Sequence, residues 1–227
     1  MSLGLRRGRK LRGGTTMARY ELAIFDFDGT LADTVPWFAG IINEVADRFG
    51  FKRVHRDEYD LLRGFTPTEI MSHLDIPFWR VPAIAAYVKR RLAEEIDEVA
   101  LVDGIAQVLR ELWDADVMIA VVSSNDERTV RQILGPELVG LFDDFECGVA
   151  LFGKSVKLRK VLRHTRIPIE RAIYVGDEIR DIEAAHDVGM HFGAVSWGYN
   201  NPASFADYDP EHVFREVDDI VTTIAPS

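Results

Sequence analysis

The chain has 227 residues, of which 47% are apolar and 28% charged; this balance excludes a disordered or fibrous protein and allows a sizeable core. The length suits one domain with an insertion, or two domains. The net charge is −10, and it becomes −15 once the five cations near the N-terminus are set aside. Because so acidic a body repels polyanions, we expect no nucleic-acid partner.

Residues 1–17 form a basic leader without acidic residues. Its cations are Arg6, Arg7, Arg9, Lys10 and Arg12. Such a leader can be an arm that touches RNA or a membrane, but we interpret it as a disordered start or an expression remnant, with the folded part beginning at about Met17. No stretch of the chain reaches the roughly 20 apolar residues that span a bilayer, and the leader lacks the apolar centre of a secretory signal. We therefore expect a cytoplasmic protein with no membrane partner.

Five apolar runs of strand length lie along the chain. They occupy residues 22–25, 117–122, 145–150, 172–175 and 192–195. The segments between the later runs have apolar residues at helical spacing, as in 105–112 and 158–162. Strands that alternate with helices predict right-handed βαβ units, and therefore an α/β fold whose parallel sheet is covered on both faces.

About 70 residues interrupt this alternation after the first strand. Residues 33–100 have helical periodicity, with Pro36 near one helix start, a helix-start pattern at 66–69, and a long amphipathic segment at 81–99. An all-helical insertion at this point predicts a cap over the α/β body. The predicted organisation is thus a leader (1–17), an α/β core (18–32 and 101–227) and a helical cap domain (33–100).

Polar residues follow four of the predicted strands, at the edge of the sheet where ligands bind in such folds. After the first strand, Asp26 and Asp28 lie two residues apart, so both acids lie on one side of the chain. The groups after the next three strands are Ser123-Ser124-Asn125, then Lys154 with Lys157, then Asp177 with Asp181. Singly, each residue is more typical of a turn, a helix cap or a solvated charge, and the inference depends on their common position.

Four carboxylates are expected to converge at this edge: Asp26, Asp28, Asp177 and Asp181. They would raise one another's pKa unless a cation lay among them. Oxygen ligands select a hard ion, and Mg²⁺ suits a few protein oxygens together with waters and a substrate phosphate. The six histidines are scattered and show no zinc-site spacing. The sequence therefore predicts a Mg²⁺ site.

The same residues meet the needs of phosphoryl transfer, which are a nucleophile, a proton donor and compensation of charge on the phosphoryl oxygens. We expect Asp26 to attack phosphorus and form an aspartyl phosphate, and Asp28 to protonate the leaving oxygen and later to deprotonate water. Ser123 and Lys154 are expected to hold the phosphoryl oxygens, with Lys157 as a rival amine. The metal would be held by Asp177 with help from Asp181.

With these residues in place, the chain resembles the haloacid dehalogenase superfamily of phosphohydrolases from about Tyr20 to its end. The motifs that carry the resemblance are the Asp-x-Asp-Gly-Thr pattern at 26–31, Ser123, a Lys, and Gly176-Asp177 followed by Asp181. The resemblance implies a Rossmann-like core with strand order 5-4-1-2-3 and an inserted helical cap. It also implies that Mg²⁺ is bound by Asp26, the backbone carbonyl of Asp28, and Asp177.

Within that superfamily the chain is most similar to phosphoglycolate-phosphatase-like members, through 33–34, 63–65, 175–185 and 195–199. The expected function is hydrolysis of a small-molecule phosphate monoester, by a monomer or homodimer. Substrate contacts are expected from Ser124, Asn125, and from Arg63 and Thr66 in the cap, although a surface Arg that bonds a helix end is an equal alternative for Arg63. The cap aromatics Trp37, Phe38, Phe78 and Trp79 either line a lid pocket or, as we favour, pack the cap.

Four rival functions remain open to different degrees. A phosphomutase similar to β-phosphoglucomutase would use the same Asp26 and would need a cap base, for which His73 or Lys89 would have to serve. A dehalogenase is disfavoured because it does not need Asp28 as a proton donor. A non-catalytic phosphate-binding protein is disfavoured because both acids of the first motif are present, and a receiver domain is disfavoured by the length and the helical insertion.

Overall fold

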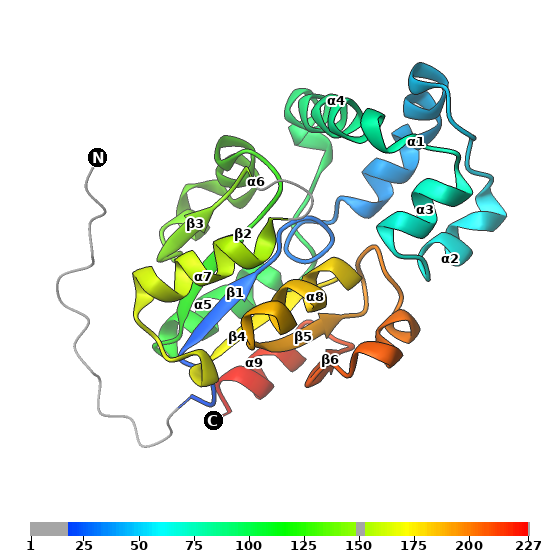
Figure 1. Cartoon of the computed structure of the whole chain (residues 1–227). Helices are drawn as coiled ribbons and strands as arrows, with labels where there is room; N and C mark the ends of the chain where they lie inside the picture. The colour runs from blue at the N-terminus through cyan, green and yellow to red at the C-terminus, as the bar shows by residue number, and fades with distance from the viewer. Residues whose placement is uncertain (1–17, 149–152, 227) are drawn as a thin grey trace.

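The computed structural model describes residues 18–148 and 153–226 (Figure 1). The predicted leader and the last two residues of the third predicted strand lie outside this described part. Six parallel strands form one sheet in the order β3-β2-β1-β4-β5-β6. The strands are β1 (Leu22–Phe25), β2 (Met118–Val122), β3 (Asp144–Glu146), β4 (Ala172–Gly176), β5 (His191–Val195) and β6 (His212–Phe214). The predicted five-strand order is therefore confirmed, with one strand added at the β5 edge.

Two details of the strands differ from the prediction. The third strand begins at Asp144, which pairs with Ala120, and ends at Glu146, ahead of most of the apolar run at 145–150. The sixth strand gives little signal in the sequence because it is an edge strand of three residues, in which Phe214 is buried and Val213 is 40% exposed.

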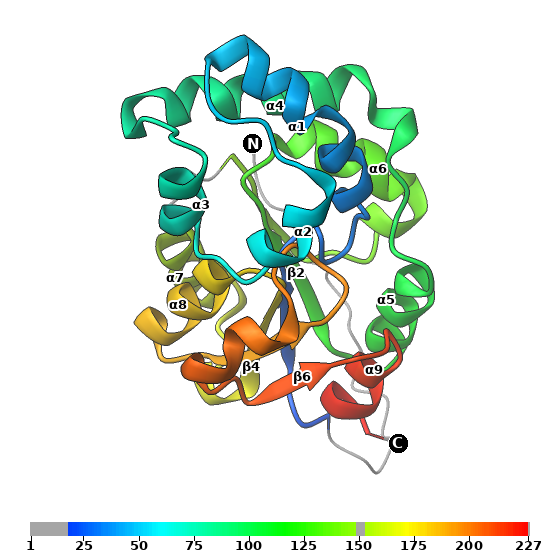
Figure 2. The same cartoon turned by 90° about the vertical axis from the view of Figure 1, so that its right-hand side faces the viewer.

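Helices cover both faces of the sheet, as Figure 2 shows. One face packs against α5 (Ile105–Asp114), α6 (Glu127–Val139) and α9 (Asp219–Ile224), and the other against α7 (Lys154–Thr165) and α8 (Ile179–Val188). Successive residues of β1 enter different clusters, Ala23 and Phe25 the first, Leu22 and Ile24 the second. This two-sided burial explains why the strands appear in the sequence as unbroken apolar runs.

The inserted segment is helical and lies beyond the carboxyl end of the sheet (Figures 1 and 2). Its helices are α1 (Val35–Phe49), α2 (Tyr59–Leu62), α3 (Pro67–His73) and α4 (Val81–Glu94), joined by 3₁₀ turns at Arg56–Glu58, Phe78–Arg80 and Ile96–Glu98. The helix starts predicted at Pro36 and at 66–69 are confirmed, the second by a capping box between Thr66 and Glu69. Every residue of 33–100 is described, and none of them lies in a strand.

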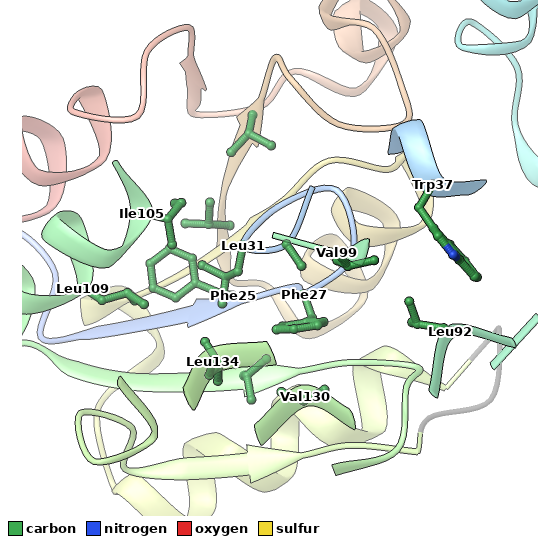
Figure 3. Close-up of a cluster of buried hydrophobic side chains, with 14 of the residues drawn as sticks. Phe25, Phe27, Leu31, Trp37, Leu92, Val99, Ile105, Leu109, Val130 and Leu134 are labelled. Atoms are coloured by element: carbon green, nitrogen blue, oxygen red, sulfur yellow. The ribbon is translucent and has the colours of Figure 1, made fainter. Parts of the chain in front are cut away.

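The two chain segments that join cap and core run side by side. Ala32 and Leu101 form an antiparallel bridge, and the amide of Asp33 donates to the carbonyl of Ala100. Apolar side chains continue from the core through this junction: Figure 3 shows Phe27, Leu31, Val99, Leu92 and Trp37 along one cluster of buried side chains. The cap is therefore connected to the core by packing as well as by the chain.

The cap aromatics divide into two pairs. Trp37 is 9% exposed, and Phe38 is half-buried against the same cluster. Phe78 and Trp79 are 66% and 79% exposed, so they pack neither the cap nor a pocket, contrary to both interpretations from the sequence. In the described part of the chain, no helix combines the length and the apolar character needed to cross a membrane.

Candidate active site

Asp26 lies directly beyond β1, the strand at the centre of the sheet, and is 1% exposed. Its backbone amide continues the β1–β4 ladder by donating to the carbonyl of Val175. Its Oδ1 lies 2.8 Å from Nζ of Lys154, while its Oδ2 is buried without a hydrogen-bond partner among the described residues. A buried carboxylate oxygen in this state is suited to bind a cation or a hydrogen-bond donor.

Lys154 is the first residue of α7 and is 3% exposed. Its ammonium contacts the carboxylates of Asp26 and Asp181. Burial alone would lower the pKa of Lys154, but the two carboxylates outweigh it and raise the pKa above its ordinary value, so the amine is charged. Lys157 lies one turn further along α7, is 29% exposed and pairs with Glu146. The structure thus brings Lys154, rather than its rival, to Asp26.

Asp28 lies at the same edge, and its two carboxylate oxygens each accept a 2.8 Å hydrogen bond from Nδ2 of Asn125. Burial raises the pKa of Asp28 to about 6, although Lys154 opposes the shift. A carboxyl group with that pKa exchanges a proton near neutral pH. Ser123 is fully buried where β2 ends, and its hydroxyl accepts from the amide of Asn125 at 3.0 Å.

Asp177 follows β4 and is fully buried. Its Oδ1 accepts from the Thr30 hydroxyl at 2.8 Å, and its Oδ2 accepts from the Tyr199 amide at 2.7 Å. Two glycines let the backbone approach this carboxylate: Gly29 has a φ of +74°, and a Cβ on either Gly29 or Gly198 would collide with Asp177. Asp177 is therefore fixed by the loops after β1 and β5.

The donor set fits a hard divalent cation. Asp26, Asp177 and Asp181 each offer a carboxylate oxygen, and these oxygens all lie within 4.8 Å of one another. Burial raises the pKa of Asp26 to about 7 and that of Asp177 well above its ordinary range, with the neighbouring carboxylates adding to both shifts. A cation among them would relieve this repulsion.

Of the three acids, Asp181 accepts the most hydrogen bonds. Its Oδ1 accepts from the Tyr174 hydroxyl and from Lys154, and its Oδ2 accepts from the backbone amide of Glu178. With these donors in place, Asp181 orients Lys154 toward Asp26. Asp26 has an oxygen without a partner among the described residues, and Asp177 has fewer donors than Asp181. The supporting role of Asp181 stays a prediction.

The two predicted cap residues of the site already have partners. The Arg63 guanidinium donates to the carbonyls of Gly198 at 3.0 Å and Tyr199 at 3.3 Å, in the loop after β5. The Thr66 hydroxyl donates to Glu69 and accepts from its amide, and so it caps α3. Arg63 therefore joins cap to core, and its role as a substrate contact stays a prediction, as does that of Thr66.

Two residues of the site were not predicted. Asn200 binds both parts of the molecule, since its Nδ2 donates to the carbonyls of Arg63 and Phe65 and its Oδ1 accepts from the amide of Ile179. Arg180 pairs with Glu178, and its Nε is buried without a partner among the described residues. Arg180 lies between Asp177 and Asp181 in the sequence. Its position after the fourth strand could therefore have identified it as a residue of the site.

A cavity of about 620 Å³ separates cap and core beside these residues. The core side of its wall is polar and includes Asp28, Ser124, Asn125 and Arg180. The cap side is mostly apolar and is formed largely by side chains of α1, α2, α3 and α4. A carboxyl group, two polar side chains and a guanidinium thus meet an apolar chamber at the edge of the sheet.

Gly198→Ala tests the packing around Asp177. The added Cβ would push the carboxylate away from its position, so we expect the Mg²⁺ concentration for half-maximal activity to rise about 10- to 100-fold. A Mg²⁺ titration of activity measures this. Gly40→Ala is the matched control, because a Cβ there meets open space. Equal Mg²⁺ requirements in the two variants would contradict the assignment of Asp177 as a metal ligand.

Comparison with known proteins agrees with this geometry. A family model described as haloacid dehalogenase-like hydrolase matches residues 23–195. A phosphoglycolate phosphatase of Synechococcus elongatus is 29% identical over 205 residues, which cover 90% of this chain and 97% of that protein. The tyrosine-protein kinase PtkA of Mycobacterium tuberculosis is 30% identical over 193 residues, 82% of this chain and 65% of that protein.

Solved structures give the same fold. A haloacid dehalogenase-like hydrolase of Streptococcus pneumoniae superposes with a TM-score of 0.74 at 20% identity, over 90% of this chain and 98% of its own. CbbY of Rhodobacter sphaeroides, in complex with phosphate, superposes with a TM-score of 0.67 at 23% identity, over 88% of this chain and 96% of its own. Because the family model matches residues 23–195, and the cap, the strand order and the cluster of acids agree with that match, the chain belongs to the haloacid dehalogenase-like hydrolases.

Proposed function

We propose that this protein is a Mg²⁺-dependent phosphatase that hydrolyses a small-molecule phosphate monoester through an aspartyl phosphate on Asp26. The observation that carries the proposal is the setting of Asp26. Its buried carboxylate contacts Lys154 through Oδ1, has no partner among the described residues at Oδ2, and shares a cluster of acids with Asp177. Asp28, two residues further on, is on the wall of a cavity. The name of the Synechococcus relative, a phosphoglycolate phosphatase, supports the same reaction.

In the first step, a carboxylate oxygen of Asp26 forms a bond to phosphorus, and the bond between phosphorus and the ester oxygen breaks. Asp28 gives its proton to the departing oxygen, so that a neutral alcohol leaves. The Asn125 amide holds the Asp28 carboxylate in place at 2.8 Å. A pKa of about 6 lets Asp28 carry this proton near neutral pH in part of the molecules.

In the second step, Asp28, now ionised, takes a proton from a water molecule as that water attacks the aspartyl phosphate. The bond between phosphorus and the Asp26 oxygen breaks, which releases inorganic phosphate and restores the carboxylate. One residue therefore serves as acid and then as base. The cavity beside Asp28 gives the alcohol a way out and the water a way in.

Charge on the phosphoryl oxygens is compensated by residues around Asp26. Lys154 is charged and fixed by Asp181, and Ser123 offers a hydroxyl at the end of β2. Mg²⁺, held by Asp26, Asp177 and the backbone carbonyl of Asp28, would supply further positive charge when bound. Tyr174 and Thr30 keep the acids oriented by the hydrogen bonds described above.

Removal of the metal provides a direct test. Hydrolysis of p-nitrophenyl phosphate is expected with Mg²⁺ and is expected to stop with EDTA. With Mg²⁺ at about 100 times its Kd, the free energy of unfolding should rise by about 2.7 kcal/mol. Metal-independent turnover would contradict the proposal, and so would a thermal midpoint that does not respond to Mg²⁺.

This gain in stability should depend on pH. The pKa of Asp26 is raised to about 7 and that of Asp28 to about 6, whereas both would lie near 4 in the unfolded chain. Between these values the metal-free folded protein binds more protons than the unfolded chain, so its free energy of unfolding falls as the pH rises from about 4 to about 7. We therefore expect Mg²⁺ to raise the thermal midpoint more at about pH 8 than at about pH 5.

A phosphomutase is the second candidate, because one of its two possible bases lies on the cavity. Lys89 of α4 is on the cavity wall, whereas His73 pairs with Glu58 at 3.0 Å. A mutase primed with a sugar bisphosphate would convert a sugar monophosphate faster than it releases inorganic phosphate. Quantifying both products in one assay separates the two functions.

A further inference from the structure

The apolar chamber of the cavity is continuous with the proposed catalytic residues. Asp28, Ser124 and Asn125 are on its wall, and from there it extends between α1, α3 and α4 of the cap. The apolar side chains of the cap on this wall include Trp37, Phe38, Ile42, Met71, Ile84 and Val88. A volume of about 620 Å³ is within the range of pockets that enclose drug-sized ligands, and it is far larger than a glycolate group requires.

The leaving group of the substrate must enter this chamber. In the proposed reaction, phosphorus lies at Asp26, and the departing oxygen takes its proton from Asp28, which is on the cavity wall. Because attack and departure are in line, the atoms beyond that oxygen point away from the buried Asp26 and into the cavity. The chemistry of the cap wall therefore decides which alcohol is accepted.

Most polar groups of the cap on this wall are already bound within the protein. The Trp37 indole donates to Glu95, the Tyr59 hydroxyl donates to the carbonyl of Ala39, and Arg63 donates to carbonyls of the 196–199 loop. Thr34 accepts from the Tyr199 hydroxyl. Substrate hydroxyls or a carboxylate would lose water here and find few partners, which is costly, whereas apolar atoms would gain from burial.

We propose, on the basis of the proposed function, that the physiological substrate is the phosphate monoester of an alcohol with an apolar body of at least about six carbons. The phosphate occupies the polar edge at Asp26 and Lys154, and the apolar body lies among the cap side chains. Arg63 and Lys89 are cap cations on the wall, and Arg63 is already bound to carbonyls of the 196–199 loop. A substrate chosen by Lys89 would instead carry a carboxylate. The experiment below separates these two cases.

A series of ethyl, butyl and hexyl phosphate tests the proposal, since the three leaving alcohols have similar basicity and differ in apolar length. Each methylene that becomes buried should raise kcat/KM up to about fourfold. We expect a rise of at least about tenfold from ethyl to hexyl phosphate, and a higher kcat/KM for hexyl phosphate than for phosphoglycolate. Equal rates along the series, or a preference for phosphoglycolate, would overturn the inference while leaving the phosphatase function in place.

Failure of the proposed function has a different signature. In that case none of these esters, nor p-nitrophenyl phosphate, is hydrolysed with Mg²⁺, and both proposals fall. Calorimetric titration of the Asp26→Asn protein with hexyl and ethyl phosphate gives a readout independent of turnover, with tighter binding expected for the longer chain. Equal affinities would count against the apolar site.

A variant that fills the cavity, with a matched control, gives a further test. Ala85 of α4 is on the cavity wall and half-buried, while the next residue, Ala86, is exposed to solvent. Ala85→Trp should lower the hexyl-to-ethyl ratio of kcat/KM by at least about tenfold, and Ala86→Trp should keep the ratio. Ala85→Leu serves if the larger side chain unfolds the cap, which circular dichroism would reveal. An unchanged ratio in a folded Ala85 variant would overturn the assignment of the chamber.

Discussion

Asp26→Asn is expected to abolish turnover of any phosphate ester, by on the order of 10⁴-fold or more, because the amide cannot form the bond to phosphorus. The substitution keeps the shape of the side chain and removes a charge from a group of acids that repel one another. The fold should therefore remain intact. Steady-state hydrolysis of p-nitrophenyl phosphate with Mg²⁺ measures the loss, and mass spectrometry of acid-quenched wild-type protein should detect the phosphorylated Asp26 peptide.

Asp114→Asn is the matched control for this substitution. Asp114 is an exposed carboxylate at the end of α5, so its loss removes the same charge at a place far from the acids. We expect wild-type rates in that protein. Substantial turnover by Asp26→Asn, or phosphate found on another residue, would remove Asp26 as the nucleophile.

Lys154→Ala is expected to reduce both activity and stability, whereas Lys157→Ala should do little to either. Lys154 is 3% exposed between Asp26 and Asp181, so its removal leaves two buried carboxylates without their cation. Breaking a buried pair in this way typically costs about 3–5 kcal/mol. Loss of the ammonium next to phosphorus should cost about 10²- to 10³-fold in kcat.

The two lysines are a close comparison because they lie one turn apart on α7. Lys157 is 29% exposed and shares Glu146 with Lys160, so its loss leaves that acid with a partner. Chemical denaturation gives the stability of each variant, and kcat at saturating Mg²⁺ gives the catalytic effect. If Lys154→Met folds stably and retains wild-type kcat, the amine has no role in charge compensation.

Much of the fold could be predicted from the sequence because the sheet is buried on both faces. Strands such as β2 and β4 are unbroken apolar runs, and the helices between them show clear periodicity. The strand β6 could not be predicted in this way, because it is short, lies at the edge of the sheet and leaves Val213 exposed. Its pairing with β5 is a tertiary contact without a local pattern.

Part of the candidate site could also be predicted from the sequence. Parallel strands end at one edge, so acids after β1 and β4 had to converge, and they do. The choice between Lys154 and Lys157 depended on the rotation of α7 against the sheet, which spacing alone does not give. The cavity and the tie of Arg63 to the β5 loop depend on how the cap lies over the core, and no single segment encodes that position.

The loop 196–200 contacts both Asp177, in the cluster of acids, and the cap. The Tyr199 amide holds Asp177, while the carbonyls of Gly198 and Tyr199 and the side chain of Asn200 hold the segment around Arg63. A cap that moved outward would have to break the bonds at residues 198–200, and Tyr199, whose amide holds Asp177, is among these residues. If the cap opens to admit substrate, we therefore expect Asp177 to lose its fixed position, so that hydrolysis takes place only after the cap has closed again.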